Sequence, residues 1–322
     1  MRTVSSTPGL GKKNLRLAAI AVFGGLLPAQ SIVAQVTTSW TGNGGQNVWT
    51  NLDNWGIDGF PNTGSIALIQ SGGTGTNLFL REGTSGSVDV GTLIFNHASY
   101  RNILSGTGLA TLNFGASGGI DFDGPPEEKG SGEGPRVIGE FSGSNPTVSF
   151  QLPTAGLLTF RARREVELNA GVFGTGSVQF DRLGTMGLPV ITIGSNTQSE
   201  FSGGATLNPD VNLLINGSSN PGFTNGPLGV GTTALAGGIL SLNSVTLGNY
   251  MHVTADSLVT GSGTLTGNML LSTQSGTIQT GRRMQVDAGN LFVFNNATYS
   301  PTDTGTFSVL STAEGYTAFD VI

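Results

Sequence analysis

A short unit recurs along this chain of 322 residues: an apolar residue, any residue, and then phenylalanine. In a β-strand, residues i and i+2 lie on the same face, so each unit places two apolar side chains on one face and the middle side chain on the other. The spacing therefore predicts many short strands, each buried on one face. The units occupy residues 93–95, 112–114, 120–122, 148–150, 158–160, 178–180 and 292–294.

Glycine bounds most of these units and accounts for 52 residues of the chain. Gly174, Gly237 and Gly261 each begin a Gly-rich corner, where positive φ and close approach of two backbone segments favour glycine. Downstream of residue 34, apolar residues do not follow a helical spacing, and there is no Gly-X-Y period. We therefore expect an all-β chain that folds as a parallel β-helix, or β-solenoid, made of stacked short strands. An N-terminal β-sandwich followed by a β-helix is the alternative.

The first 34 residues differ in composition from the rest. Lys12, Lys13 and Arg16 precede an apolar run at residues 17–27, and Ala34 offers a small residue for cleavage. This pattern is typical of a secretory signal peptide. The run is shorter than the ~20 residues that a membrane-spanning helix needs. We expect a secreted or cell-surface protein whose mature chain has no membrane-spanning segment.

Charge and cysteine content restrict the partners and the chemistry. The first 34 residues hold four of the 14 basic residues and none of the 20 acidic ones, so the remainder has a formal charge near −10. An acidic protein is a poor partner for nucleic acid, and we expect none. The chain has no cysteine, which excludes disulfides, thiolate–zinc sites and cysteine nucleophiles.

Residues 201–281 carry a longer pattern. FSGGAT begins at Phe201, LLING at Leu213, GPLGVG at Gly226 and GGILSL at Gly237, and TGSGTLTGN follows. This succession resembles the autotransporter-associated β-strand repeat, and the Trp-rich start of the mature chain is similar to the start of such exported proteins. The resemblance implies a right-handed β-helix of passenger type, displayed on or released from a bacterial cell surface. The ~10-residue alternating strands of a translocator barrel are not recognisable, so self-translocation is not expected.

These patterns divide the chain into four segments: a signal peptide (1–34), an N-terminal cap with the first strands (35–121), a loop rich in Gly, Pro and Glu (122–136), and the β-helix (137–322). Asp121 and Asp123 stand where the loop begins. With loop carbonyls they could bind calcium, which takes six to eight oxygen ligands. The alternative is a solvated surface loop, because the later ligands of a calcium-binding motif are missing. Calcium is the only cofactor that the sequence suggests.

Catalytic groups are few. His97 and His252 are the two histidines, and we expect both to face solvent. The G-x-S-x-G sequence at Gly115, Ser117 and Gly119 lacks the strand–turn–helix setting that gives this motif its meaning, and a chance match is expected in so glycine-rich a chain. The sequence therefore favours a protein that is not an enzyme.

A row of charges follows one of the Phe units. By strand alternation, Arg161, Arg163, Glu165 and Glu167 point outward, and Arg164 breaks the alternation as a bulge would. We expect ion pairs along this row, each of small energy. A polysaccharide lyase would also use arginines and acids on an outer face. It would require a base beside bound calcium, and no Asp accompanies this row in the sequence.

All three tryptophans lie in residues 39–64, among Gly and Asn. Trp40, Trp49 and Trp55 could form a platform for a glycan, or they could cover the first strands of a solenoid, whose open end would otherwise pair with other chains. The spacing predicts that Trp49 and Trp55 lie on different sides of a loop, which favours the cap.

The leading interpretation is a non-catalytic structural or adhesin-like protein of the extracellular space or cell surface. Its expected partners are extracellular polysaccharide or cell-surface components. The alternatives are a carbohydrate-binding module and a β-helix polysaccharide lyase.

Overall fold

The computed structural model of the protein describes residues 36–45, 47–56, 59–69, 77–80, 86–96, 102–104, 109–123, 136–139, 141–142, 145–146, 148–185, 187–195, 197–220, 222–267, 269–271, 284–286, 292–295 and 298–299. The chain divides into Met1–Ala34 and Gln35–Ile322, and the described residues all belong to the second unit. The predicted signal peptide and His97 lie outside the described residues.

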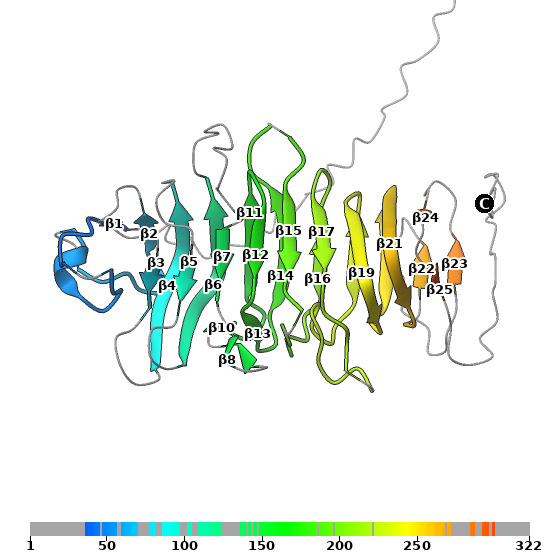
Figure 1. Ribbon diagram of the computed structural model, residues 1–322, viewed down its shortest axis with the longest axis horizontal. Coiled ribbons are helices and arrows are strands. Elements are labelled where there is room, and N and C mark those ends of the chain that lie inside the picture. Colours follow the sequence, from blue (N-terminus) through cyan, green and yellow to red (C-terminus); the bar gives the residue numbers. More distant parts are fainter. Residues whose placement is uncertain are drawn as a thin grey trace, which may run out of the picture. The chain divides into compact units, whose positions relative to one another are not determined.

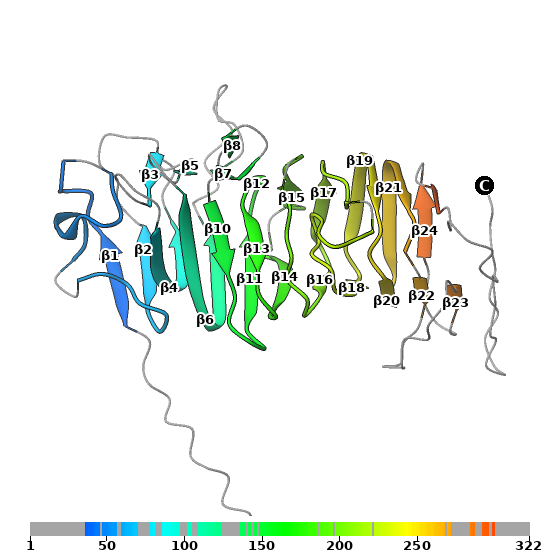
Figure 2. The same cartoon turned by 90° about the horizontal axis from the view of Figure 1, so that it is seen from below.

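Almost every strand belongs to one of two sheets with parallel pairing, and between residues 177 and 271 the chain alternates between the two sheets (Figures 1 and 2). The first sheet has the order β1 (Thr37–Trp40), β2 (Ile66–Ile69), β4 (Gly86–Phe95), β6 (Ala110–Phe122), β11 (Leu157–Ala162), β14 (Ser177–Arg182), β16 (Ala205–Leu207), β18 (Thr233–Ala236), β20 (Met251–Ala255), β22 (Met269–Leu271) and β23 (Met284–Val286), and β10 (Val148–Gln151) pairs with both β6 and β13 (Gly171–Phe173).

The second sheet has the order β24 (Phe292–Asn295), β21 (Ser257–Leu265), β19 (Ile239–Leu247), β17 (Asn212–Ile215), β15 (Val190–Ile193), β12 (Val166–Leu168), β7 (Arg136–Ile138), β5 (Asn102–Leu104) and β3 (Asn77–Phe79), and β25 (Thr298–Tyr299) also pairs with β21. The other elements are the antiparallel pair β8 (Phe141–Ser142) and β9 (Asn145–Pro146), and the 3-10 helix η1 (Leu52–Asn54).

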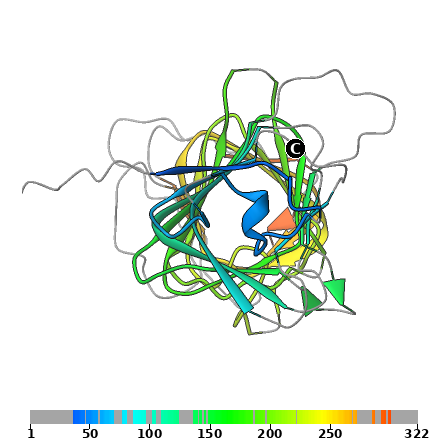
Figure 3. The ribbon, with the colours of Figure 1, turned by 90° about the vertical axis from the view of Figure 1, so that its left-hand side faces the viewer.

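We call a strand of the first sheet and the following strand of the second sheet a rung. The chain passes through β14 and β15, then β16 and β17, then β18 and β19, and each strand pairs with its counterpart one rung away. Figure 3 shows the strands of both sheets around a common interior. The all-β prediction is confirmed, and the long parallel sheets are compatible with a β-solenoid.

Period-two burial builds the core, as the Phe units predict. Both apolar residues are buried in each of the six units between residues 93 and 180, and the side chains of the seventh, 292–294, lie outside the described part of the structure. Parallel register places phenylalanines above one another: Phe95 stacks on Phe122, and Phe160 stacks on Phe180, with 5.7 Å between ring centroids in each pair. The core is therefore a column of side chains that continues from rung to rung.

The alternative prediction, an N-terminal β-sandwich, is wrong. β1, β2, β4 and β6 pair in parallel and continue into the same sheet as β11, so they do not form a separate sandwich. Of the predicted loop at 122–136, Phe122 ends β6 and Arg136 begins β7, and residues 124–135 lie outside the described residues. Within the described residues, no helix has the length and apolar character required to cross a membrane.

Gly174, Gly237 and Gly261 all have the positive φ that the sequence predicts, although Gly261 lies within β21 and not at a corner. Gly174 has a φ of +113°, and a Cβ there would overlap the carbonyl oxygen of Leu152, which belongs to the neighbouring chain segment. Both constraints exclude other residues at this corner.

Candidate functional site

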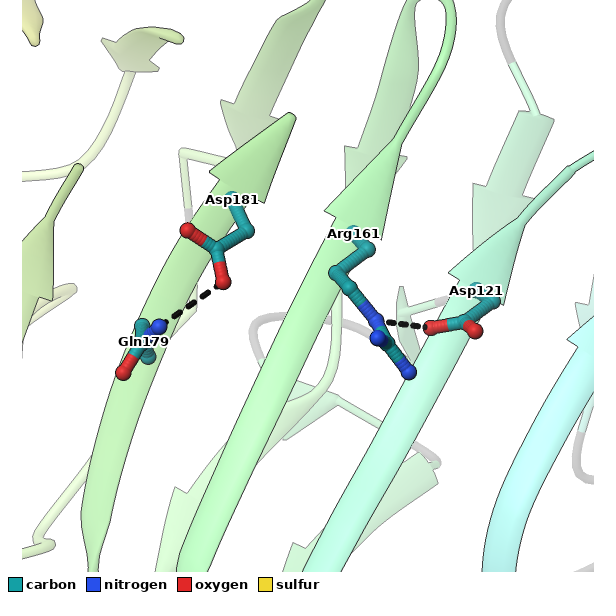
Figure 4. A network of polar contacts seen from close by, with 4 residues as sticks. All are labelled: Asp121, Arg161, Gln179 and Asp181. Carbon is teal, nitrogen blue, oxygen red and sulfur yellow. Dashed lines mark hydrogen bonds and ion pairs between the residues drawn. The ribbon is translucent and has the colours of Figure 1, made fainter. Parts of the chain in front are cut away.

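Three outward-facing charges form a row across neighbouring strands. Asp121 of β6, Arg161 of β11 and Asp181 of β14 are register partners, and the residues before them, Ile120, Phe160 and Phe180, are buried. Strand alternation therefore places all three charges on the outer face. Figure 4 shows them side by side.

The central arginine binds one of its two acidic neighbours. Arg161 donates from Nε to Oδ1 of Asp121 at 2.6 Å. Asp181 instead accepts from the side-chain amides of Gln179 at 2.7 Å and Asn208 at 2.5 Å (Figure 4 shows the first of these bonds). Side-chain hydrogen bonds thus join β6 to β11 and, separately, join β14 to Asn208, which directly follows β16.

Two further ion pairs also connect neighbouring rungs. Arg163 donates to Oδ1 of Asp123, and Nη1 of Arg182 lies 3.2 Å from Oδ2 of Asp210. The prediction of ion pairs along the Arg161–Glu167 row is therefore wrong for Arg161 and Arg163, which pair with Asp121 at the end of β6 and with Asp123 directly after it. The statement that no Asp accompanies the row is wrong as well. Arg161 lies 40 residues from Asp121 in sequence, and only the register of β11 on β6 brings them together.

The corner that follows β11 explains Arg164. Phe160, Ala162, Val166 and Leu168 are buried as alternation predicts. Arg164, however, lies between β11 and β12, where the chain turns from the first sheet to the second. The predicted bulge is therefore a corner between two strands.

The pKa of the Asp121 carboxyl group is shifted by its surroundings. Burial raises its pKa above the ordinary value of 3.8, the hydrogen bond and charge of Arg161 oppose that rise, and Asp123 adds to it. Because the folded-state pKa is the higher one, this group favours folding most below the unfolded-state pKa. The contribution is lost as pH rises through the raised pKa. At neutral pH Arg161 therefore only partly offsets the cost of burying the Asp121 carboxylate.

The calcium prediction named the same two carboxylates. Asp121 and Asp123 each bond to an arginine, which would compete with a cation for the carboxylate oxygens. Among the described residues, no three His, Asp or Glu side chains gather closely enough to hold a metal ion. Calcium at this position remains a prediction from the sequence.

The three tryptophans form one buried cluster. Trp55 contacts both others edge to face, with ring centroids 5.0 Å from Trp40 and 4.7 Å from Trp49. Its Nε1 donates to the carbonyl oxygen of Trp49 at 2.7 Å. The predicted placement of Trp49 and Trp55 on different sides of a loop is therefore wrong. All three side chains are buried, so they offer no open ring face to a glycan.

The chain around this cluster covers the first edge of both sheets. The backbone N–H of Trp49 donates to the carbonyl oxygen of Phe79 on β3 at 2.7 Å. The backbone N–H of Phe79 donates to the carbonyl oxygen of Asn47, also at 2.7 Å. On the first sheet, the backbone N–H of Gly56 donates to the carbonyl oxygen of Ser39 on β1 at 2.9 Å, and the N–H of Thr41 donates to the carbonyl oxygen of Asn54 at 2.7 Å. Residues 47–56 therefore satisfy backbone groups that an open edge would expose.

The other candidate groups stay apart. His252 lies between buried Met251 and Val253 and is partly exposed, as alternation predicts, but its Nε2 atom is buried, so the ring does not fully face solvent. Gly115, Ser117 and Gly119 all lie within strand β6, so the G-x-S-x-G sequence has no strand–turn–helix setting.

The charged row lies beside the Phe units in the sequence. Asp121 is the middle residue of the unit 120–122, and Arg161 follows the unit 158–160. Superposing the units 120–122 and 158–160 would pair Phe122 with Phe160, whereas the observed register pairs Ile120 with Phe160 and Asp121 with Arg161, so the repeat alone does not predict this contact. Comparison of the chain with protein-family models, with curated proteins and with solved structures finds no match.

Proposed function

We propose that this chain is a non-catalytic, exported structural or adhesin-like protein of a bacterial cell surface, built as a right-handed parallel β-helix. The observation that carries the proposal is the pairing of its outer charges. Arg161, Arg163 and Arg182 each bond to an Asp of an adjacent strand or its flanking turn. Side chains used in this way hold neighbouring strands in register and do not converge on a substrate.

The segment that resembles the autotransporter-associated repeat supports the same proposal. In residues 201–242, the apolar parts of the pattern coincide with β16, β17 and β19, and the Gly-rich parts lie between them. Each of these strands pairs in parallel one rung away. A repeat whose units cannot bury a core alone gains stability by such stacking, which suits an extended surface protein.

The charged row favours a second candidate, a polysaccharide-acting enzyme. A carboxyl group with a raised pKa beside a guanidinium is found at many catalytic sites, and Asp121 with Arg161 has that form. Structural ion pairs also shift pKa values, and both groups are already bonded to each other.

Incubation with polysaccharides separates the two candidates. Residues 35–322 should release no reducing or unsaturated ends from pectin, alginate or neutral glycans, with or without calcium, relative to heat-treated protein. Reproducible product would overturn the non-catalytic proposal. If that product disappeared in both Asp121→Asn and Arg161→Ala, the charged row would be the active site.

A further inference from the structure

An aromatic ring is held at the surface by an unusual backbone at Phe223. Its φ is +56°, a conformation that bulky residues seldom adopt. Strain of this kind is concentrated at functional sites such as ligand clamps. The ring lies on Gly248 of the next rung, where an added Cβ would overlap the ring carbons Cδ1 and Cε1. Backbone therefore supports one side of the ring, while 36% of the residue stays exposed.

Backbone hydrogen bonds fix the loop that carries this ring. Ser219 N donates to the carbonyl of Thr246 at 2.9 Å, and the Ser219 hydroxyl accepts from Gly248 N at 3.3 Å. At the other end, Gly226 exchanges hydrogen bonds with Ser199 at 2.9 and 3.1 Å. The loop is thus bonded to the rungs on both sides. A ring fixed before binding loses little conformational freedom when a ligand arrives.

The segment that carries Phe223 and Gly248 is polar and uncharged in sequence and has a second exposed aromatic residue. Tyr250 follows Gly248 by two residues, and 43% of its surface is exposed. Between Asp210 and Asp256 the sequence has no Asp, Glu, Lys or Arg, while Ser, Thr and Asn are frequent. Neutral sugars present C–H faces that pack on aromatic rings and hydroxyl groups that bond to amides and hydroxyls. A charged ligand would find no counter-charge within this segment.

We propose that Phe223 and Tyr250 form a binding site for a neutral polysaccharide. The inference rests on the proposed non-catalytic surface role and adds to it a partner of defined chemistry. It assigns binding to this loop and not to the tryptophans, whose rings are buried.

Affinity electrophoresis in gels that contain laminarin, galactomannan or polygalacturonate tests the site, together with sedimentation on insoluble cellulose. We expect retention by at least one of the three neutral glycans. Phe223→Ala and Tyr250→Ala should each weaken it about tenfold or more, as loss of a central aromatic contact does, and Phe223→Tyr should retain it. Leu188→Ala removes an apolar side chain that is 48% exposed on a different loop, and should bind as the unchanged protein does.

Thermal melting of each variant shows whether the fold is kept, and Tyr250→Ala carries the test if Phe223→Ala unfolds. The inference fails if no neutral glycan is retained, if only polygalacturonate is, or if the aromatic variants bind normally. A dimer that Phe223→Ala abolishes would instead make this surface a contact between two copies. Product released from a bound glycan would overturn the non-catalytic proposal and leave the binding site standing. Absence of both binding and product would overturn the binding site and leave the non-catalytic proposal standing.

Discussion

Replacement of Trp55 with alanine is expected to lower the free energy of unfolding by about 3–5 kcal/mol, the cost of truncating a large buried aromatic residue. Trp55 is the centre of its cluster, since it contacts Trp40 and Trp49 and donates to the Trp49 carbonyl. Alanine would leave a cavity and an unpaired buried carbonyl together. Denaturant unfolding of residues 35–322 measures the loss.

The same variant should also associate end to end. Trp55 lies between Asn54 and Gly56, whose backbone groups cover the edge of β1. If this segment loosens, the freed edge can pair with another chain, and sedimentation velocity would detect the larger species. Leu52→Ala is the matched control, because Leu52 lies in the same segment but is 58% exposed. Unchanged stability of Trp55→Ala, combined with lost retention on a glycan, would show that the tryptophans bind ligand and do not cap the sheets.

Phe160→Ala should cost a similar amount, about 3–5 kcal/mol, for a different reason. Phe160 is buried in the middle of the stack, with ring centroids 5.7 Å from both Phe150 and Phe180. Its loss opens a cavity that rungs on both sides share. Phe160→Leu fills more of the space and should cost less.

Thr159→Ala is the control for this position, since Thr159 precedes Phe160 on the opposite face of β11, and it should change stability by no more than about 0.5 kcal/mol. Equal midpoints of denaturation for Phe160→Ala and Thr159→Ala would show that the burial pattern of β11 is wrong.

The sequence was sufficient for local features and insufficient for long-range ones. Alternation alone predicted the buried faces of Phe114, Phe150 and Phe180, because the strand period of two depends only on neighbouring residues. Glycine at 174 predicted a positive φ for the same kind of reason.

Features that depend on register could not be read in this way. The contact of Asp121 with Arg161 requires β11 to pair with β6, and the loops between rungs have unequal lengths. The contact of Trp49 with Trp55 depends on hydrogen bonds from this loop to both sheets. Phe223 gave no signal at all, because a positive φ is not expected of phenylalanine.

Parallel stacking of distant segments is the central claim, and a pair of cysteines tests it directly in a chain that has none. The hydroxyl oxygens of Thr111 on β6 and Ser149 on β10 lie 2.9 Å apart, although 38 residues separate them in sequence. Neighbouring strands are about 4.8 Å apart, which falls within the Cα separations that a disulfide spans. Thr111→Cys with Ser149→Cys should therefore crosslink under mild oxidation, seen as a shift on a non-reducing gel. The pair Thr111→Cys with Gln151→Cys should crosslink far less, because Gln151 lies two residues beyond Ser149 on the same face of β10 and pairs with Asn113. Failure of the first pair, or equal crosslinking of both, would contradict the parallel register on which the whole account depends.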